Sequence, residues 1–164
     1  MRSIYIQSQR ASVLGRLGRA EEECQTLRFV HELRLRLEGP DSDATLLAAA
    51  NFGLSLLRTN SRFAEAKTFA AAQLPMARQK YGAHNITMTL IEVLAGASLM
   101  DPDATEGDLR EAEALFEEGF RMSRQILGAA HPETKTKQNT LSQIRKKLAD
   151  PDRYTGVVCT TATY

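Results

Sequence analysis

The chain has 164 residues, of which 43% are hydrophobic and 25% are charged, and its formal net charge at pH 7 is +1. So small a net charge creates no long-range field for nucleic acid or an acidic membrane, and we expect neither as a partner. The two cysteines, Cys24 and Cys159, lie far apart, and no segment has the apolar length of a signal peptide or a membrane span, so we expect a cytoplasmic protein.

Alanine, leucine, glutamate and arginine dominate the sequence, and all four favour helices. In chain order, chain-breaking residues and apolar spacing predict helices over about 2–16, 20–37, 44–59, 63–80, 86–100, 108–127 and 133–149. Pro75 lies inside the fourth of these, so we expect a kink or break there, because proline removes a backbone hydrogen bond. Residues 150–164 contain the one β-branched run, and we expect them to form a flexible tail.

A repeating pattern links these helices. Three glycines follow long helical stretches, and each is followed within a few residues by a threonine; the pairs are Gly39 with Thr45, Gly82 with Thr87, and Gly128 with Thr134. A small residue stands 21 positions before each of these glycines, at Gly18, Ser61 and Gly107. We interpret each unit as two helices joined by a tight turn at the small residue. The later glycine then ends the second helix in the left-handed conformation, and a polar loop with threonine or aspartate starts the next helix.

The three threonines are 42 and 47 residues apart, and the longer interval has a local cause. The breaker-rich segment 101–107 (DPDATEG) is interpreted as a short insertion between the helices of the third unit. The second helix of each unit carries one buried apolar stripe. Its residues are Ala66, Phe69, Ala70, Gln73, Met76 and Tyr81 in the second unit, and Ala112, Leu115, Phe116, Gly119, Met122 and Ile126 in the third. Cys24 takes the small position in the first unit, and we expect a buried small hydrophobe.

Several short phrases carry a family resemblance. LGAAHPET at 127–134 has the form L-G-x-x-H-P-x-T, and SRFAEA at 61–66 and GRAEEE at 18–23 approximate G-R-aromatic-E-E-A. Together they resemble the tetratricopeptide (TPR) repeats of the kinesin light chain type. The resemblance implies an all-α protein, a right-handed α-solenoid of antiparallel helix hairpins. Its expected parts are units of about 2–40, 41–84 and 85–131, a capping helix at 132–149 and the tail at 150–164.

The resemblance also implies a function, that of an interaction scaffold which binds a peptide or a partner helix on the concave face. In such repeats an asparagine about six residues after the threonine can bond the backbone of an extended peptide. Asn51 holds that position in the second unit, and Asn139 nearly holds it in the last helix. In the third unit the position is taken by Glu92 or Val93, which departs from the family pattern. We therefore predict Asn51, Glu92 and Asn139 as peptide contacts. Weak self-association through the open ends is a further expectation.

An alternative function remains open, in which the chain is a regulatory or sensor arm of a larger multidomain protein or enzyme. The first predicted helix begins without a capping signal, which would fit missing upstream repeats.

Catalytic and cofactor chemistry finds little support in the sequence. There is no phosphate-binding loop, nucleophile elbow or paired-carboxylate motif, so we expect neither an enzyme nor a small-molecule substrate. The three histidines, His31, His84 and His131, have no partners at metal-ligand spacing, so no metal and no cofactor are expected. The last predicted helix is rich in cations, which we interpret as a solvated face that suits the helix dipole. These cations are Lys135, Lys137, Arg145, Lys146 and Lys147.

Overall fold

The computed structural model describes residues 2–59, 61–82 and 85–150, in which the chain forms seven α-helices and no strand. The helices are α1 (Arg2–Arg16), α2 (Ala20–Glu38), α3 (Asp43–Arg58), α4 (Phe63–Tyr81), α5 (Asn85–Met100), α6 (Glu106–Leu127) and α7 (Pro132–Ala149). The predicted all-α class is confirmed, and every helix boundary falls within two residues of its expected position. The expected tail lies outside the described residues except for Asp150. None of the helices in the described part of the chain is long and apolar enough to cross a membrane.

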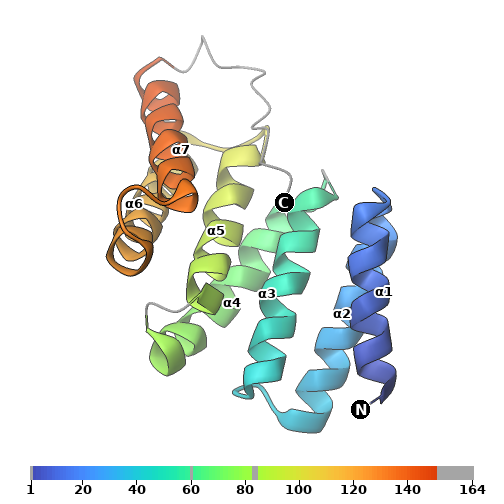
Figure 1. The fold of residues 1–164 in the computed structure, drawn as a ribbon. Helices are drawn as coiled ribbons and strands as arrows, with labels where there is room; N and C mark the ends of the chain where they lie inside the picture. Colours follow the sequence, from blue (N-terminus) through green and yellow to red (C-terminus); the bar gives the residue numbers. More distant parts are fainter. Residues whose placement is uncertain (1, 60, 83–84, 151–164) are drawn as a thin grey trace.

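The helices are arranged in two layers. Figure 1 shows α1, α3, α5 and α7 side by side in the front layer, with α2, α4 and α6 behind them. Consecutive helices run in opposite directions, and each contacts the next one along the chain. Within the front layer, α3 and α5 also contact each other directly. Each pair of consecutive helices therefore forms a hairpin that packs against the following hairpin.

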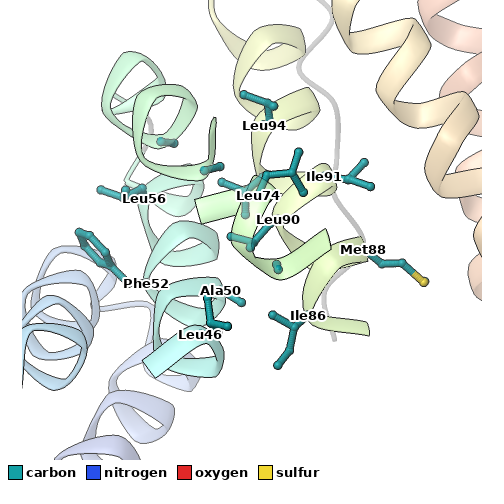
Figure 2. Close-up of a cluster of buried hydrophobic side chains, with 14 of the residues drawn as sticks. Leu46, Ala50, Phe52, Leu56, Leu74, Ile86, Met88, Leu90, Ile91 and Leu94 are labelled. Carbon is teal, nitrogen blue, oxygen red and sulfur yellow. The ribbon is translucent and has the colours of Figure 1, made fainter. Parts of the chain in front are cut away.

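The largest apolar core lies in the middle of the molecule, where α3, α4 and α5 meet. Figure 2 shows Leu46 and Leu56 on α3, Leu74 on α4, and Leu90 and Leu94 on α5 as parts of this cluster. Leu46, Leu56 and Leu90 are fully buried. Burial of each such side chain contributes about 1.5–3 kcal/mol relative to exposure, so the central helices hold most of the stabilising apolar contacts.

Charged contacts in the rear layer recur at a separation of about 40 residues. Lys67 on α4 donates to Asp108 on α6 at 2.5 Å, and these residues are 41 apart. Arg78 on α4 pairs with Glu118 on α6 at 2.6 Å, with a separation of 40. Arg28 on α2 similarly reaches Glu65 on α4, 37 residues later. The repeat length seen in the sequence is thus also the spacing at which successive hairpins touch.

The glycines that end the rear helices have the positive φ that was expected of them. Gly39, Gly82 and Gly128 have φ values of 86°, 55° and 88°, and each donates its N–H to a carbonyl of the last helical turn. A side chain would be strained at such positive φ, which explains why glycine ends α2, α4 and α6. The prediction that glycine ends these three helices is confirmed, but the predicted left-handed conformation is not adopted, because the ψ values are 170°, −122° and 163°.

The residues that start the helices differ from the expectation. The hydroxyl of Ser42, rather than Thr45, caps α3 by accepting the N–H of Thr45. His131 caps α7, and Thr134 lies buried in the first turn of that helix. Local side-chain capping favours the residue just before the helix, so the threonines serve as small buried residues of the first turn.

Two further details of the helical units need correction. Gly107 lies inside the first turn of α6, because Thr105 and Asp108 form a reciprocal capping box that starts the helix earlier. Among the predicted turn residues Gly18, Ser61 and Gly107, Gly18 has a positive φ, of 71°, which suits a tight turn between α1 and α2. Ile126 is 54% exposed and is not part of the buried stripe. It lies in the last turn of α6, which at 22 residues is longer than its 16-residue neighbour α5.

Of the kink or break expected at Pro75, the break is not found, because α4 runs without interruption from Phe63 to Tyr81. Pro75 lies on the exposed side of α4, and Ala71, whose carbonyl loses its helical partner, is exposed as well. Water can therefore satisfy that carbonyl, while the buried residues Leu74 and Ala77 hold the helix against its neighbours.

Candidate functional site

The candidate surface begins with the exposed side of α3 in the front layer. Leu47 and Asn51 are one helical turn apart, and Arg58 lies two turns further along the same side. Leu47 is 50% exposed, and Asn51 is exposed as well. An apolar side chain next to an amide and a guanidinium can contact both the side chains and the backbone of an extended peptide. Asn51 is therefore accessible on the exposed side of α3.

A buried carboxylate fixes the position of Arg58. The Nη1 atom of Arg58 donates to Oε1 of Glu23 on α2 at 2.5 Å, and Glu23 is only 5% exposed. Glu23 lies under Gly15 of α1, where an added Cβ atom would come within 2.9 Å of the same oxygen. Gly15 therefore leaves room for the carboxylate, and the carboxylate orients the arginine at the end of the exposed side of α3.

Glu92 on α5 occupies a different environment. Its carboxylate pairs with the Nζ atom of Lys137 on α7, which also donates to Glu133 at 2.7 Å. The Lys137 side chain is only 4% exposed, whereas the two carboxylates are about one-third exposed. Burial alone would lower the pKa of Lys137, but the two carboxylates outweigh it and raise that pKa above its usual value. The ammonium is therefore charged, and Glu92 contributes to holding α7 on α5.

Asn139 is exposed on α7, two residues after Lys137. Two positions along an α-helix correspond to about 200° of rotation, so Asn139 faces away from the side that meets Glu92. The structure therefore separates Glu92 from Asn139. Their roles as peptide contacts, like that of Asn51, stay predictions.

The interpretation of the α7 cations as a solvated face is wrong for one of them. Lys137 is buried between two carboxylates, as described above. Lys135 and Lys146 are exposed, and Arg145 is half-exposed and pairs with Glu113 of α6 at 2.6 Å. The sequence offered one signal for Lys137, the glutamate four residues before it, because Glu–Lys pairs at this spacing lie on one helix face.

The histidines considered in the sequence analysis lie in environments that suit packing and helix capping. His31 is buried against two aromatic rings, with its ring centroid 5.2 Å from that of Phe69 and 6.3 Å from that of Phe52. Burial lowers the pKa of His31. The ring of His131 caps α7, and His84 lies outside the described residues.

Cys24 is fully buried, as expected for a small apolar residue. Burial raises the pKa of its thiol, which disfavours the reactive thiolate. Within the described ranges, His, Cys, Asp and Glu form no group that could hold a metal ion.

Comparisons with known proteins add no family to this geometry. No model of a known protein family matches the chain. A search of curated proteins likewise finds no significant match. The function must therefore be argued from the arrangement of the helices and their exposed side chains.

Proposed function

We propose that the chain is a TPR-like helical-repeat scaffold that binds an extended peptide or a partner helix. In this proposal the hairpins α1–α2, α3–α4 and α5–α6 are three repeat units of a right-handed solenoid, and α7 is its capping helix. We assign the binding surface, the concave side of the solenoid, to the layer of α1, α3, α5 and α7, which lies in front in Figure 1.

The observation that carries this proposal is the recurrence of hairpin contacts at about 40 residues, as in the pairs of Lys67 with Asp108 and Arg78 with Glu118. A chain built from similar hairpins in sequence presents a row of parallel helices as one continuous surface. On the central helix of that row, Leu47, Asn51 and Arg58 are exposed together. An exposed apolar residue flanked by hydrogen-bonding groups suits a peptide in which side chain and backbone are both recognised.

Selection of a random peptide library on the immobilised chain, followed by fluorescence anisotropy of the selected peptides, tests this function. Asn51→Ala should weaken binding by about tenfold, because a lost hydrogen bond to a ligand backbone costs roughly 1–1.5 kcal/mol. Gln125→Ala is the matched control, since Gln125 is an exposed amide on α6 in the rear layer. Selection of no peptide, or equal loss in both variants, would contradict binding on the front layer.

A further inference from the structure

The N-terminal hairpin exposes a mixed apolar and charged face. On α1, Ile6, Arg10 and Val13 follow one another at helical spacing and are exposed, and Leu17 continues the line just after the helix. Ile6, Val13 and Leu17 are 58%, 53% and 65% exposed, and Phe29 of α2 is 51% exposed. A groove of about 360 Å³ runs between the two helices; its lining residues are Gln7, Arg10, Glu22, Gln25, Thr26 and Phe29. We call the surface formed by the exposed residues Ile6, Arg10, Val13, Leu17 and Phe29, together with the groove between α1 and α2, the end face.

The following units bury the positions that correspond to this face. Counted 42 residues further along, the positions of Ile6, Arg10 and Val13 fall on α3, and after another 42 they fall on α5. All six residues are buried there: Ala48, Phe52 and Ser55 on α3, and Leu90, Leu94 and Ala97 on α5. On α3 the side is covered by the preceding hairpin, as the stacking of Phe52 on His31 of α2 shows. The end face is thus the corresponding packing side of the first hairpin, and no hairpin among the described residues covers it.

The charges on the end face are self-complementary. Among the described residues α1 carries no carboxylate, whereas α2 contributes Glu22 to the other wall of the groove. Arg10 forms no ion pair within the described part of the chain, and Glu22 pairs only with Arg19, an exposed neighbour three residues before it. Arg10 and Glu22 therefore line one groove without pairing with each other. By contrast, the exposed side of α7 at the opposite end is polar and basic, with Lys135, Gln138 and Lys146.

We propose that two copies of the chain associate through their end faces about a two-fold axis that runs between α1 and α2, parallel to both. This arrangement packs α1 of each copy on α2 of the other, so that the two hairpins form a four-helix bundle. Val13 and Phe29 then fill the centre, and Arg10 of one copy meets Glu22 of the other. The four apolar side chains, each half-exposed or more, would bury on the order of 400 Å² of apolar surface per copy in the dimer. This apolar area is about half of the roughly 800 Å² per partner of a standard interface, so we expect a weak dimer that dissociates in the micromolar range.

Sedimentation velocity over about 1–200 μM protein measures the association. The wild-type chain should pass from monomer to dimer in this range, while Val13→Glu should weaken the dimer at least about tenfold, because it places a charge in the apolar centre. Ile126→Glu is the matched control, since Ile126 is 54% exposed but lies on α6. Its dimer should be unchanged, and far-UV circular dichroism should show equal helix content in both variants. A wild-type chain that stays monomeric, or equal loss in both variants, would overturn the proposal.

A charge exchange tests the two-fold geometry. Arg10→Glu alone should weaken the dimer, because it brings two carboxylates together across the interface. Arg10→Glu combined with Glu22→Arg in the same chain should restore the association, because each copy then offers the exchanged pair to the other. A double variant no stronger than Arg10→Glu alone would rule out this arrangement of α1 on α2.

Discussion

His31 is an ionisable side chain held among aromatic rings, and this makes stability depend on pH. Burial lowers its pKa in the folded protein, whereas the unfolded chain binds a proton with a pKa of about 6.5. The unfolded state therefore binds more protons below about pH 6.5, and stability falls as the pH drops through that range. Glu32 acts in the opposite direction on the His31 pKa, but its effect is smaller than that of burial.

The substitution His31→Phe should remove this contribution while preserving the contacts with Phe52 and Phe69. We expect the free energy of unfolding in urea to decrease from pH 7.5 to pH 5.5 more in the wild-type chain than in the variant. His131→Phe is not a suitable control because His131 caps α7, so His131→Asn, which keeps a capping side chain, serves instead. Equal pH dependence in His31→Phe and the wild type would show that folding does not change the pKa of His31.

Lys137 is a buried cation shared by two carboxylates, and we expect it to stabilise the packing of α7. Lys137→Met keeps the buried stem but leaves Glu92 and Glu133 without their shared cation. Because those carboxylates keep partial access to water, we expect a loss of roughly 1–3 kcal/mol in the free energy of unfolding. Lys135→Met, at an exposed position of α7, should change it by less than about 0.5 kcal/mol. A similar effect of both substitutions would mean that the buried ion cluster does not hold α7.

The helices themselves follow from local signals, which is why the sequence predicts them well. Breakers such as Gly39 and Gly128 end helices through their backbone freedom, and the spacing of small and apolar residues indicates the buried sides. The partners of charged side chains do not follow from local signals. The pairing of Lys137 with Glu92, 45 residues earlier, depends on how α7 packs against α5, and no spacing rule along one helix encodes it. The same holds for the orientation of Arg58 by Glu23.

At Pro75 the tendency of proline to interrupt a helix is overcome by the packing of α4 against its neighbours. The packing of α4 between α3 and α5 keeps the helix continuous although one backbone hydrogen bond is missing. Pro75→Ala should restore that bond and raise the free energy of unfolding by about 1–2 kcal/mol, since part of the helical gain is offset by a more flexible unfolded chain. Thermal unfolding followed by circular dichroism measures the change. A variant no more stable than the wild type would mean that α4 has already relieved the strain of the proline.

The molecule as a whole consists of contacts between near neighbours. Within the described residues, the helix pairs in substantial contact are consecutive ones, together with α3 and α5. In such an arrangement the free energy of unfolding is approximately a sum over the hairpins and the interfaces between them. A destabilising substitution in a terminal hairpin should therefore affect that hairpin alone, whereas one in a central hairpin should also destabilise its neighbours. The two fully buried residues Ile4, on α1, and Leu90, on α5, allow a matched comparison.

Ile4→Ala and Leu90→Ala each create a cavity that costs about 2–5 kcal/mol locally. Hydrogen–deuterium exchange with mass spectrometry should show faster exchange in α1 and α2 for Ile4→Ala, and throughout α3 to α6 for Leu90→Ala. The difference follows from position, because Leu90 belongs to the large core to which helices α1 to α6 all contribute. Ile4 belongs to a small satellite cluster with Val30 of α2 and Ala48 of α3. If Ile4→Ala accelerated exchange in α5 to α7 as strongly as Leu90→Ala, the chain would unfold as one cooperative unit, and the division into stacked hairpins would not describe its energetics.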